Sequence, residues 1–223
     1  MPSSTIRLTA TDGHSFDAYL AGPEGRPKAG LVVIQEIFGV NAHMREVCDG
    51  YARDGYLCVS PALFDRAQQK VELGYTPADI QAGRDIRAKC AWDKVMLDVQ
   101  AAVDCAASAG KVGTVGYCWG GSIAFLSATR CSGVAAAVGY YGGQIVPFRD
   151  EKPACPVMLH FGEKDHGIPL TDVELIKAAR PEITYHIYPA DHGFNCDHRA
   201  SFEPVSARIA RERTIEFFQR HLA

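Results

Sequence analysis

The sequence predicts an α/β fold with a mostly parallel central sheet and helices on both faces. Expected strands and helices alternate from residue 30 onward, the pattern of parallel strands joined by crossover helices. Residues 30–35 read GLVVIQ, an apolar run typical of a strand buried on both faces. The chain has 223 residues, 47% of them hydrophobic, which is enough for one sizeable core. We therefore expect one domain over residues 1–223.

Each expected element has a local signal. The turn signal Asp12-Gly13 separates two strands that lack a crossover helix and suit an antiparallel edge. Asn41 can cap a helix, Pro77 can open one, and Gly110 can end one. Residues 62–76 are expected to be irregular. The expected strands cover residues 5–9, 15–21, 30–35, 57–60, 112–117, 134–140, 157–161 and 183–188. The expected helices cover residues 41–54, 77–89, about 95–110, about 119–130, 170–179 and a final apolar-striped segment ending near residue 222.

The charge and the cysteine content indicate which kinds of partner and which cellular compartment to expect. The net charge of −3, with both signs interspersed, argues against a nucleic-acid or anionic-membrane ligand. No signal peptide or membrane-spanning run is read, and the eight cysteines contain no CxxC pair. We expect free thiols, a cytoplasmic location, no nucleic-acid or membrane partner, and a monomer or small homo-oligomer.

The segment Gly116-Tyr117-Cys118-Trp119-Gly120 has the form G-x-nucleophile-x-G between an expected strand and an expected helix. In that context the motif makes a tight turn that holds the nucleophile above the sheet. The helix N-terminus favours a thiolate at Cys118, and the Trp119 amide can face a developing oxyanion. The alternative is a buried structural cysteine between two packing glycines.

An acid and a histidine follow at successive strand ends. Asp165 comes directly after the strand at 157–161, and His192 follows the strand at 183–188. The chain order nucleophile, acid, histidine is that of an α/β-hydrolase fold. His192 would move the proton and Asp165 would hold its tautomer. Glu163 and Asp191 remain the alternative acids.

Other polar clusters have weaker signals. His192, Cys196 and His198 lie close in sequence to Asp197, but their spacing matches no standard zinc pattern, so no metal is expected. Glu36 follows an apolar strand, where a carboxylate needs a role or a partner, and a salt bridge with Arg45 or Arg84 is the structural alternative. The adjacent Ile37 amide is placed to be a second oxyanion donor.

The residues also resemble a known family, the dienelactone hydrolases, or carboxymethylenebutenolidases. The resemblance runs nearly end to end. It is carried by the stretch from Gln35 to Asn41 with Met44-Arg45-Glu46, the elbow from Gly116 to Gly121, Tyr140-Tyr141-Gly142, the Asp165 loop and Asp191-His192-Gly193-Phe194.

The resemblance implies a triad of Cys118, His192 and Asp165, with oxyanion donors at the amides of Ile37 and Trp119. It implies that Glu36 contacts the resting thiol and takes up its proton as substrate binds. It also implies hydrolysis of dienelactone to maleylacetate without a metal or an organic cofactor.

This chain departs from the family at the substrate carboxylate. The family's two arginine positions fall on Ala82 and Cys196 here. Arg84 or Arg199 can substitute, and Arg84 is the first candidate for substrate binding. We therefore expect a cysteine-dependent hydrolase of small lactones or esters. The alternatives are a general carboxylesterase or thioesterase on the same triad, and a non-catalytic binding or redox-sensing protein.

Overall fold

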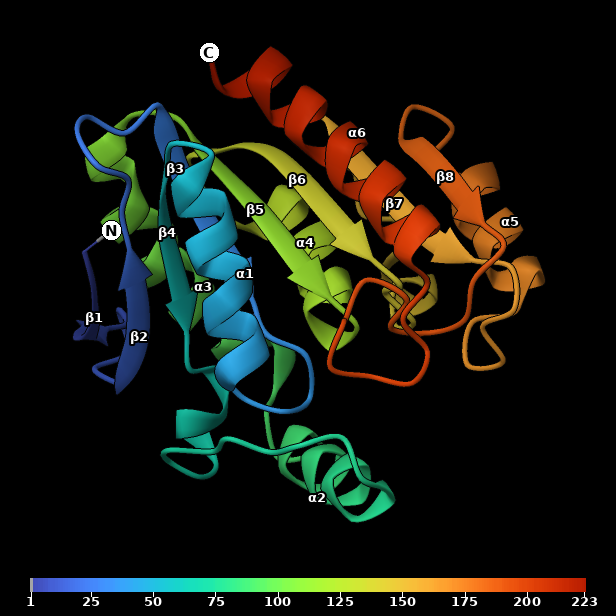
Figure 1. Cartoon of the computed structure of the whole chain (residues 1–223), viewed down its shortest axis with the longest axis horizontal. Coiled ribbons are helices and arrows are strands. Elements are labelled where there is room, and N and C mark those ends of the chain that lie inside the picture. Colours follow the sequence, from blue (N-terminus) through green and yellow to red (C-terminus); the bar gives the residue numbers. More distant parts are fainter. Residues whose placement is uncertain (1) are drawn as a thin grey trace.

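The computed structural model describes residues 2–223, and its centre is an eight-stranded sheet (Figure 1). The strand order is β1-β2-β4-β3-β5-β6-β7-β8, with β1 and β2 antiparallel at one edge and all other strands parallel to one another. The strands are β1 (Ser3–Thr9), β2 (Ser15–Ala21), β3 (Ala29–Ile34), β4 (Tyr56–Pro61), β5 (Val112–Tyr117), β6 (Val134–Tyr140), β7 (Val157–Gly162) and β8 (Thr184–Tyr188). The predicted fold and its antiparallel edge are confirmed.

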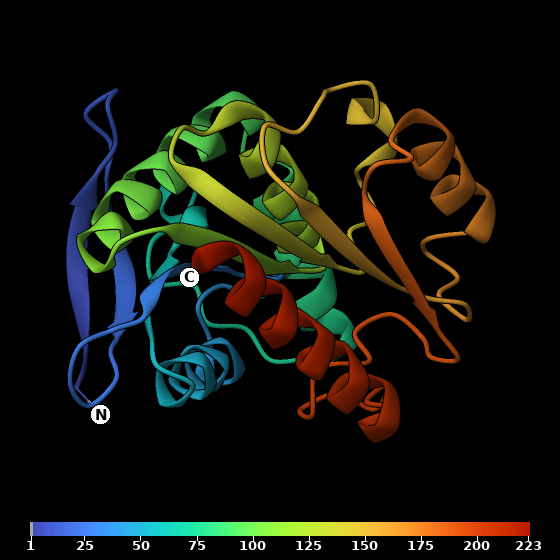
Figure 2. The same cartoon turned by 90° about the horizontal axis from the view of Figure 1, so that it is seen from above.

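Helices cover both faces of the sheet (Figure 2). α1 and α6 pack on one face, and α3 and α4 on the other, while α2 lies beyond the carboxyl ends of the strands (Figure 1). The helices are α1 (Ala42–Arg53), α2 (Pro77–Arg87), α3 (Trp92–Ala106), α4 (Trp119–Arg130), α5 (Leu170–Ala179) and α6 (Pro204–Leu222). No helix within residues 2–223 is long and apolar enough to cross a membrane.

Local signals place the helix starts. The Asn41 side chain accepts a hydrogen bond from the Met44 amide at the start of α1. Thr76 and Asp79 form a capping box at the start of α2, where Pro77 is the first helical residue. The prediction of an irregular segment at 62–76 missed one short 3-10 helix, Leu63–Arg66. Four residues are too few to give the periodicity by which a helix is recognised.

A buried polar cluster joins α6 to the sheet. The hydroxyl of Thr214 on α6 lies 2.6 Å from the Tyr140 hydroxyl and 3.1 Å from Nε2 of His160. The other ring nitrogen of His160 lies 2.8 Å from the Tyr188 hydroxyl. Tyr140, His160 and Thr214 are fully buried, so each group depends on its neighbours for hydrogen bonds. His160 is therefore a core residue.

We predict that Thr214→Val lowers the free energy of unfolding by about 1–3 kcal/mol, because it leaves buried polar atoms of Tyr140 and His160 without a partner. Urea denaturation of wild type and variant measures the difference. Thr214→Ser keeps the hydroxyl and should recover most of the loss. If Thr214→Val is as stable as the wild type, the Thr214 hydroxyl does not stabilise this cluster.

Candidate active site

Cys118 occupies the turn between β5 and α4 with a backbone that L-residues rarely adopt, at φ 56° and ψ −117°. Its amide donates to the Tyr140 carbonyl at 3.0 Å, which ties the turn to the next strand. A Cβ on Gly116 would lie 1.9 Å from the Gly120 carbonyl oxygen, and one on Gly120 would lie 2.4 Å from the Ile34 carbonyl oxygen. Only glycine fits at these two positions. The motif is therefore a tight elbow at the carboxyl edge of the sheet.

The remaining cysteines lie in environments that favour the thiol. Burial raises the pKa of Cys90 and Cys155 to about 11 and that of Cys131 to about 12. It also raises the pKa of Cys48, Cys58, Cys105 and Cys196. A neutral thiol is a poor nucleophile, so none of these seven is suited to attack a carbonyl group.

The structure brings His192 and Asp165 to the elbow from two further strand ends. Nδ1 of His192 lies 2.7 Å from Oδ2 of Asp165, whose side chain is 1% exposed. Asp165 also accepts the Gly167 amide at 2.8 Å, which fixes the carboxylate in its loop. Burial favours a neutral imidazole, but the neighbouring Cys118 side chain and the Asp165 carboxylate outweigh it and raise the pKa of His192 to about 10. The three predicted triad residues thus form one contiguous group.

Two backbone segments face the same space. Ile37 and Trp119 line the cavity that also contains Cys118. Trp119 is the first residue of α4, so its amide has no acceptor within the helix. The loop of Ile37 is covered by α2, because Gly83 approaches so closely that a Cβ there would lie 2.0 Å from the Ile37 carbonyl oxygen.

Glu36 has a different partner from those we expected. Its side chain is 1% exposed, and its Oε1 lies 3.3 Å from Nη1 of Arg199. Arg45 instead pairs with Glu72 at 2.9 Å, and Arg84 pairs with no carboxylate in the described part of the chain. The prediction of Arg45 or Arg84 was wrong because Arg199, 163 residues away, is brought in by the loop before α6. Oε2 of Glu36 is buried and finds no hydrogen-bond partner among residues 2–223.

A cavity of about 660 Å³ opens over the elbow. Three cations line it: Arg84 and Arg87 from α2, and Arg199 from the loop after β8. Arg87 donates to Oε1 of Gln144 at 2.5 Å, and its Nε is buried without a described partner. Arg199 is paired with the carboxylate of Glu36. The two arginines of α2 line the cavity without a carboxylate partner among the described residues.

Several residues of this site had no usable sequence signal. The Arg199 guanidinium lies over the rings of Phe38 and Tyr75, at 5.7 and 5.8 Å. The ring of Tyr141 packs 5.1 Å from that of His192, and its hydroxyl is buried with no described hydrogen-bond partner. These residues lie far apart in sequence, so only the packed fold reveals them. Phe38 and Tyr141 had a hint, because both belong to motifs that carried the family resemblance, and Arg199 was named only as a possible substrate-binding residue.

Comparison with known proteins gives a consistent result. The family model described as the dienelactone hydrolase family matches residues 16–222. A carboxymethylenebutenolidase of Pseudomonas putida is 34% identical over 232 residues, covering 97% of this chain and 96% of that protein. A structure from Klebsiella pneumoniae assigned to the dienelactone hydrolases has a TM-score of 0.85 at 30% identity, covering 99% of this chain and 100% of that one. A Pyrococcus furiosus esterase, at 14% identity and a TM-score of 0.75, shares the fold.

These matches extend over almost all of the sequence. They agree with the elbow at Cys118 and with the order of Cys118, Asp165 and His192 along the chain. The chain belongs to the dienelactone hydrolase family, and it is a hydrolase of ester or lactone bonds with an α/β-hydrolase fold.

Proposed function

We propose that the protein hydrolyses small lactones or esters through an acyl-enzyme on Cys118, with His192 as acid and base and Asp165 as its orienting carboxylate. The contact that carries this proposal is the 2.7 Å pair of His192 and Asp165 beside the strained Cys118 elbow. Asp165 occupies Nδ1 of the imidazole, which leaves Nε2 for the thiol.

The first half-reaction starts from the ion pair of thiolate and imidazolium. The Cys118 sulfur attacks the carbonyl carbon, and the carbonyl electron pair moves to its oxygen, where the amides of Ile37 and Trp119 can donate hydrogen bonds. The intermediate then collapses, the C–O bond to the leaving group breaks, and His192 gives its proton to the departing oxygen.

In the second half-reaction His192 is neutral and takes a proton from water, which attacks the thioester. The C–S bond breaks, the carboxylic acid product leaves, and the thiolate is regenerated opposite an imidazolium. A lactone differs from an open ester in one respect, because its leaving oxygen remains part of the acyl group, so water releases a single hydroxy acid.

Glu36 can act on this cycle through charge. Its buried carboxylate pairs with Arg199, and both Glu36 and Cys118 act electrostatically on that guanidinium. We propose that Glu36 holds Arg199 beside the thiol. When a substrate enters, the unpartnered Oε2 of Glu36 is available to take the thiol proton, and this transfer gives the thiolate with which the first half-reaction starts.

Substrate choice depends on cations that are free to pair. Arg199 is already matched by Glu36, so we propose Arg84 as the residue that binds a substrate carboxylate, with Arg87 beside it. Because the family arginine positions are Ala82 and Cys196 here, we expect a weaker preference for anionic lactones and broader activity on small neutral esters. The protein is proposed to act in the cytoplasm.

The nucleophile is tested with p-nitrophenyl acetate. Wild-type enzyme should release a burst of about one p-nitrophenolate per active site, because acylation precedes water attack. Cys118→Ala should show no burst and lose turnover, while Cys155→Ala, a half-buried cysteine outside the cavity, should behave as wild type. An alanine variant at 118 with turnover near the wild-type rate would refute the proposal.

The ion pair is tested by titrating His192. The thiolate raises the pKa of His192, so Cys118→Ala should lower that pKa from about 10 toward or below about 6.5, since burial then opposes the charged form. NMR of the imidazole nitrogens across the pH range measures it. His221 is remote from the cavity and should titrate identically in both proteins. An unchanged His192 pKa would mean that no thiolate faces the ring.

The anion site is tested by comparing two substrates. Arg84→Ala should raise the activation free energy, from kcat/KM, by about 1–3 kcal/mol more for a carboxylate-bearing lactone than for a neutral ester. Lys89→Ala removes an exposed cation that does not line the cavity, so it should affect both substrates equally. Equal losses for both substrates in Arg84→Ala would assign Arg84 a structural role and make Arg199 the next residue to test.

A further inference from the structure

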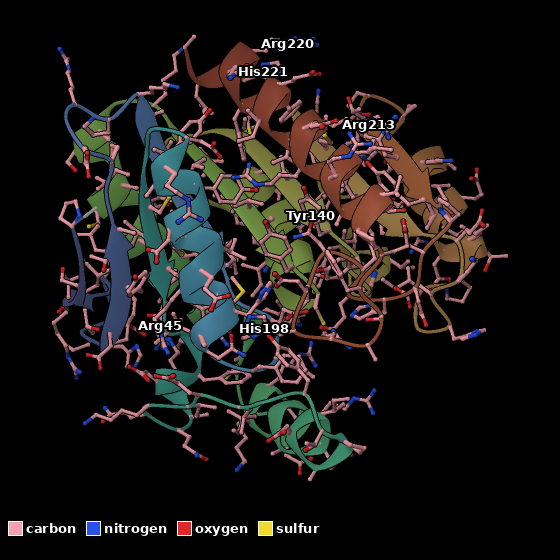
Figure 3. The ribbon with its side chains drawn as sticks, viewed as in Figure 1. Arg45, Tyr140, His198, Arg213, Arg220 and His221 are labelled. Carbon is pink, nitrogen blue, oxygen red and sulfur yellow. The ribbon has the colours of Figure 1, made fainter. Side chains whose placement is uncertain are left out.

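Outside the catalytic cavity, four potential metal ligands meet between α1 and the loop of residues 189–203 that joins β8 to α6. His43 and Glu46 lie one turn apart on α1, and Asp197 and His198 are adjacent in the loop. One donor atom from each lies within 4.8 Å of every other. In Figure 3, His198 lies beside α1 near the carboxyl edge of the sheet.

The distances fit a small four-coordinate ion. Nε2 of His198 lies 2.8 Å from Oε2 of Glu46 and 4.0 Å from Oδ1 of Asp197, and Nδ1 of His43 lies 3.3 Å from that same Oδ1. Ligand atoms about 2.0–2.2 Å from a tetrahedral zinc ion are about 3.3–3.6 Å apart. The three observed distances span that range, so small side-chain movements would bring these atoms to the tetrahedral spacing.

One of the four ligands, His43, already points a ring nitrogen into the cluster, and that nitrogen has no hydrogen-bond partner among the described residues. The side chain of His43 is 5% exposed, and its Nδ1 is buried. Although Asp197 is near, this nitrogen makes no hydrogen bond to any residue of the described chain. A buried imidazole nitrogen without a partner is costly, and a metal ion would satisfy it. This distinguishes the cluster from an ordinary group of surface charges.

We propose that His43, Glu46, Asp197 and His198 form a zinc-binding site. Two imidazoles and two carboxylates supply the nitrogen and oxygen ligands that zinc accepts, and their two negative charges balance the ion. A second group, Glu36, His43 and Cys196, shares His43 but is a poorer candidate, because Glu36 is already paired with Arg199. The sequence argued against a metal because α1 is distant from the loop in the chain and their spacing fits no known pattern.

The site has four protein ligands and no position reserved for substrate, which is the arrangement of a structural rather than a catalytic zinc. Of its two ligands in the loop, Asp197 lies five residues after His192, and His198 directly precedes Arg199. A bound ion would therefore fasten the loop of His192 to α1. The inference does not depend on the proposed acyl-enzyme chemistry.

Zinc binding is best measured in a Cys118→Ala host, because Cys118 and His192 can themselves compete for the ion. After equilibrium dialysis against zinc chloride and elemental analysis, we expect one zinc per chain. We also expect a higher thermal unfolding midpoint with zinc than without. His198→Gln and Glu46→Gln each remove an exposed ligand, so both variants should fold and bind zinc at least about 10-fold more weakly.

His221→Gln is the matched control, since His221 lies near the far end of α6 from this site and should leave zinc affinity unchanged (Figure 3). Cobalt(II) provides a second readout. Four-coordinate cobalt should give visible absorption without a thiolate charge-transfer band, and the absorption should be lost in His198→Gln. The proposal is overturned if the host binds no zinc, if both ligand variants keep host affinity, or if cobalt reports a thiolate ligand.

Discussion

The backbone of Cys118 is the constraint on which the site depends. A non-glycine residue at positive φ costs about 1–3 kcal/mol, so the surrounding structure must hold it there. Here the hydrogen bond from Cys118 to Tyr140 and the close contacts of Gly116 and Gly120 supply that restraint. A relaxed turn would move the sulfur and the Trp119 amide together. The position of the thiol and one of the two proposed oxyanion donors are thus set by a single strained residue.

Several other polar side chains of the site come from the loop of residues 189–203. It carries His192, which pairs with Asp165, and Arg199, which pairs with Glu36. It also carries His198, which contacts Glu46 on α1. Loops are more mobile than the elements they join, so positioning a proton-transfer group on one requires several anchors. These contacts tie the loop to the segments that follow β7 and β3 and to helix α1, which explains how a loop can hold an imidazole in one orientation.

The sequence predicted those parts of the structure that have a local cause. The elbow at Cys118 is a contiguous motif, and it follows a largely apolar strand, so both could be recognised. Asp165 and His192 could be placed because parallel strands end at the same edge of a sheet. The partner of Glu36 could not be placed, because Arg199 reaches it through tertiary packing. Nothing in the spacing distinguishes Arg199 from Arg45 or Arg84, both of which lie closer in sequence.

The buried charge of Glu36 limits which arginine of the cavity can pair with a substrate. A buried carboxylate without a cation costs several kcal/mol, so Glu36 requires Arg199 wherever it is retained beside the thiol. The guanidinium that neutralises Glu36 then has less charge to offer a substrate. In the proposed function the cation for an anionic substrate comes from elsewhere, because α2 contributes Arg84 to the lining of the same cavity. If Arg84 binds the substrate as proposed, the charge beside the proposed nucleophile and the charge that selects the substrate are carried by different elements, and substitutions on α2 would change specificity without disturbing the pair at Glu36.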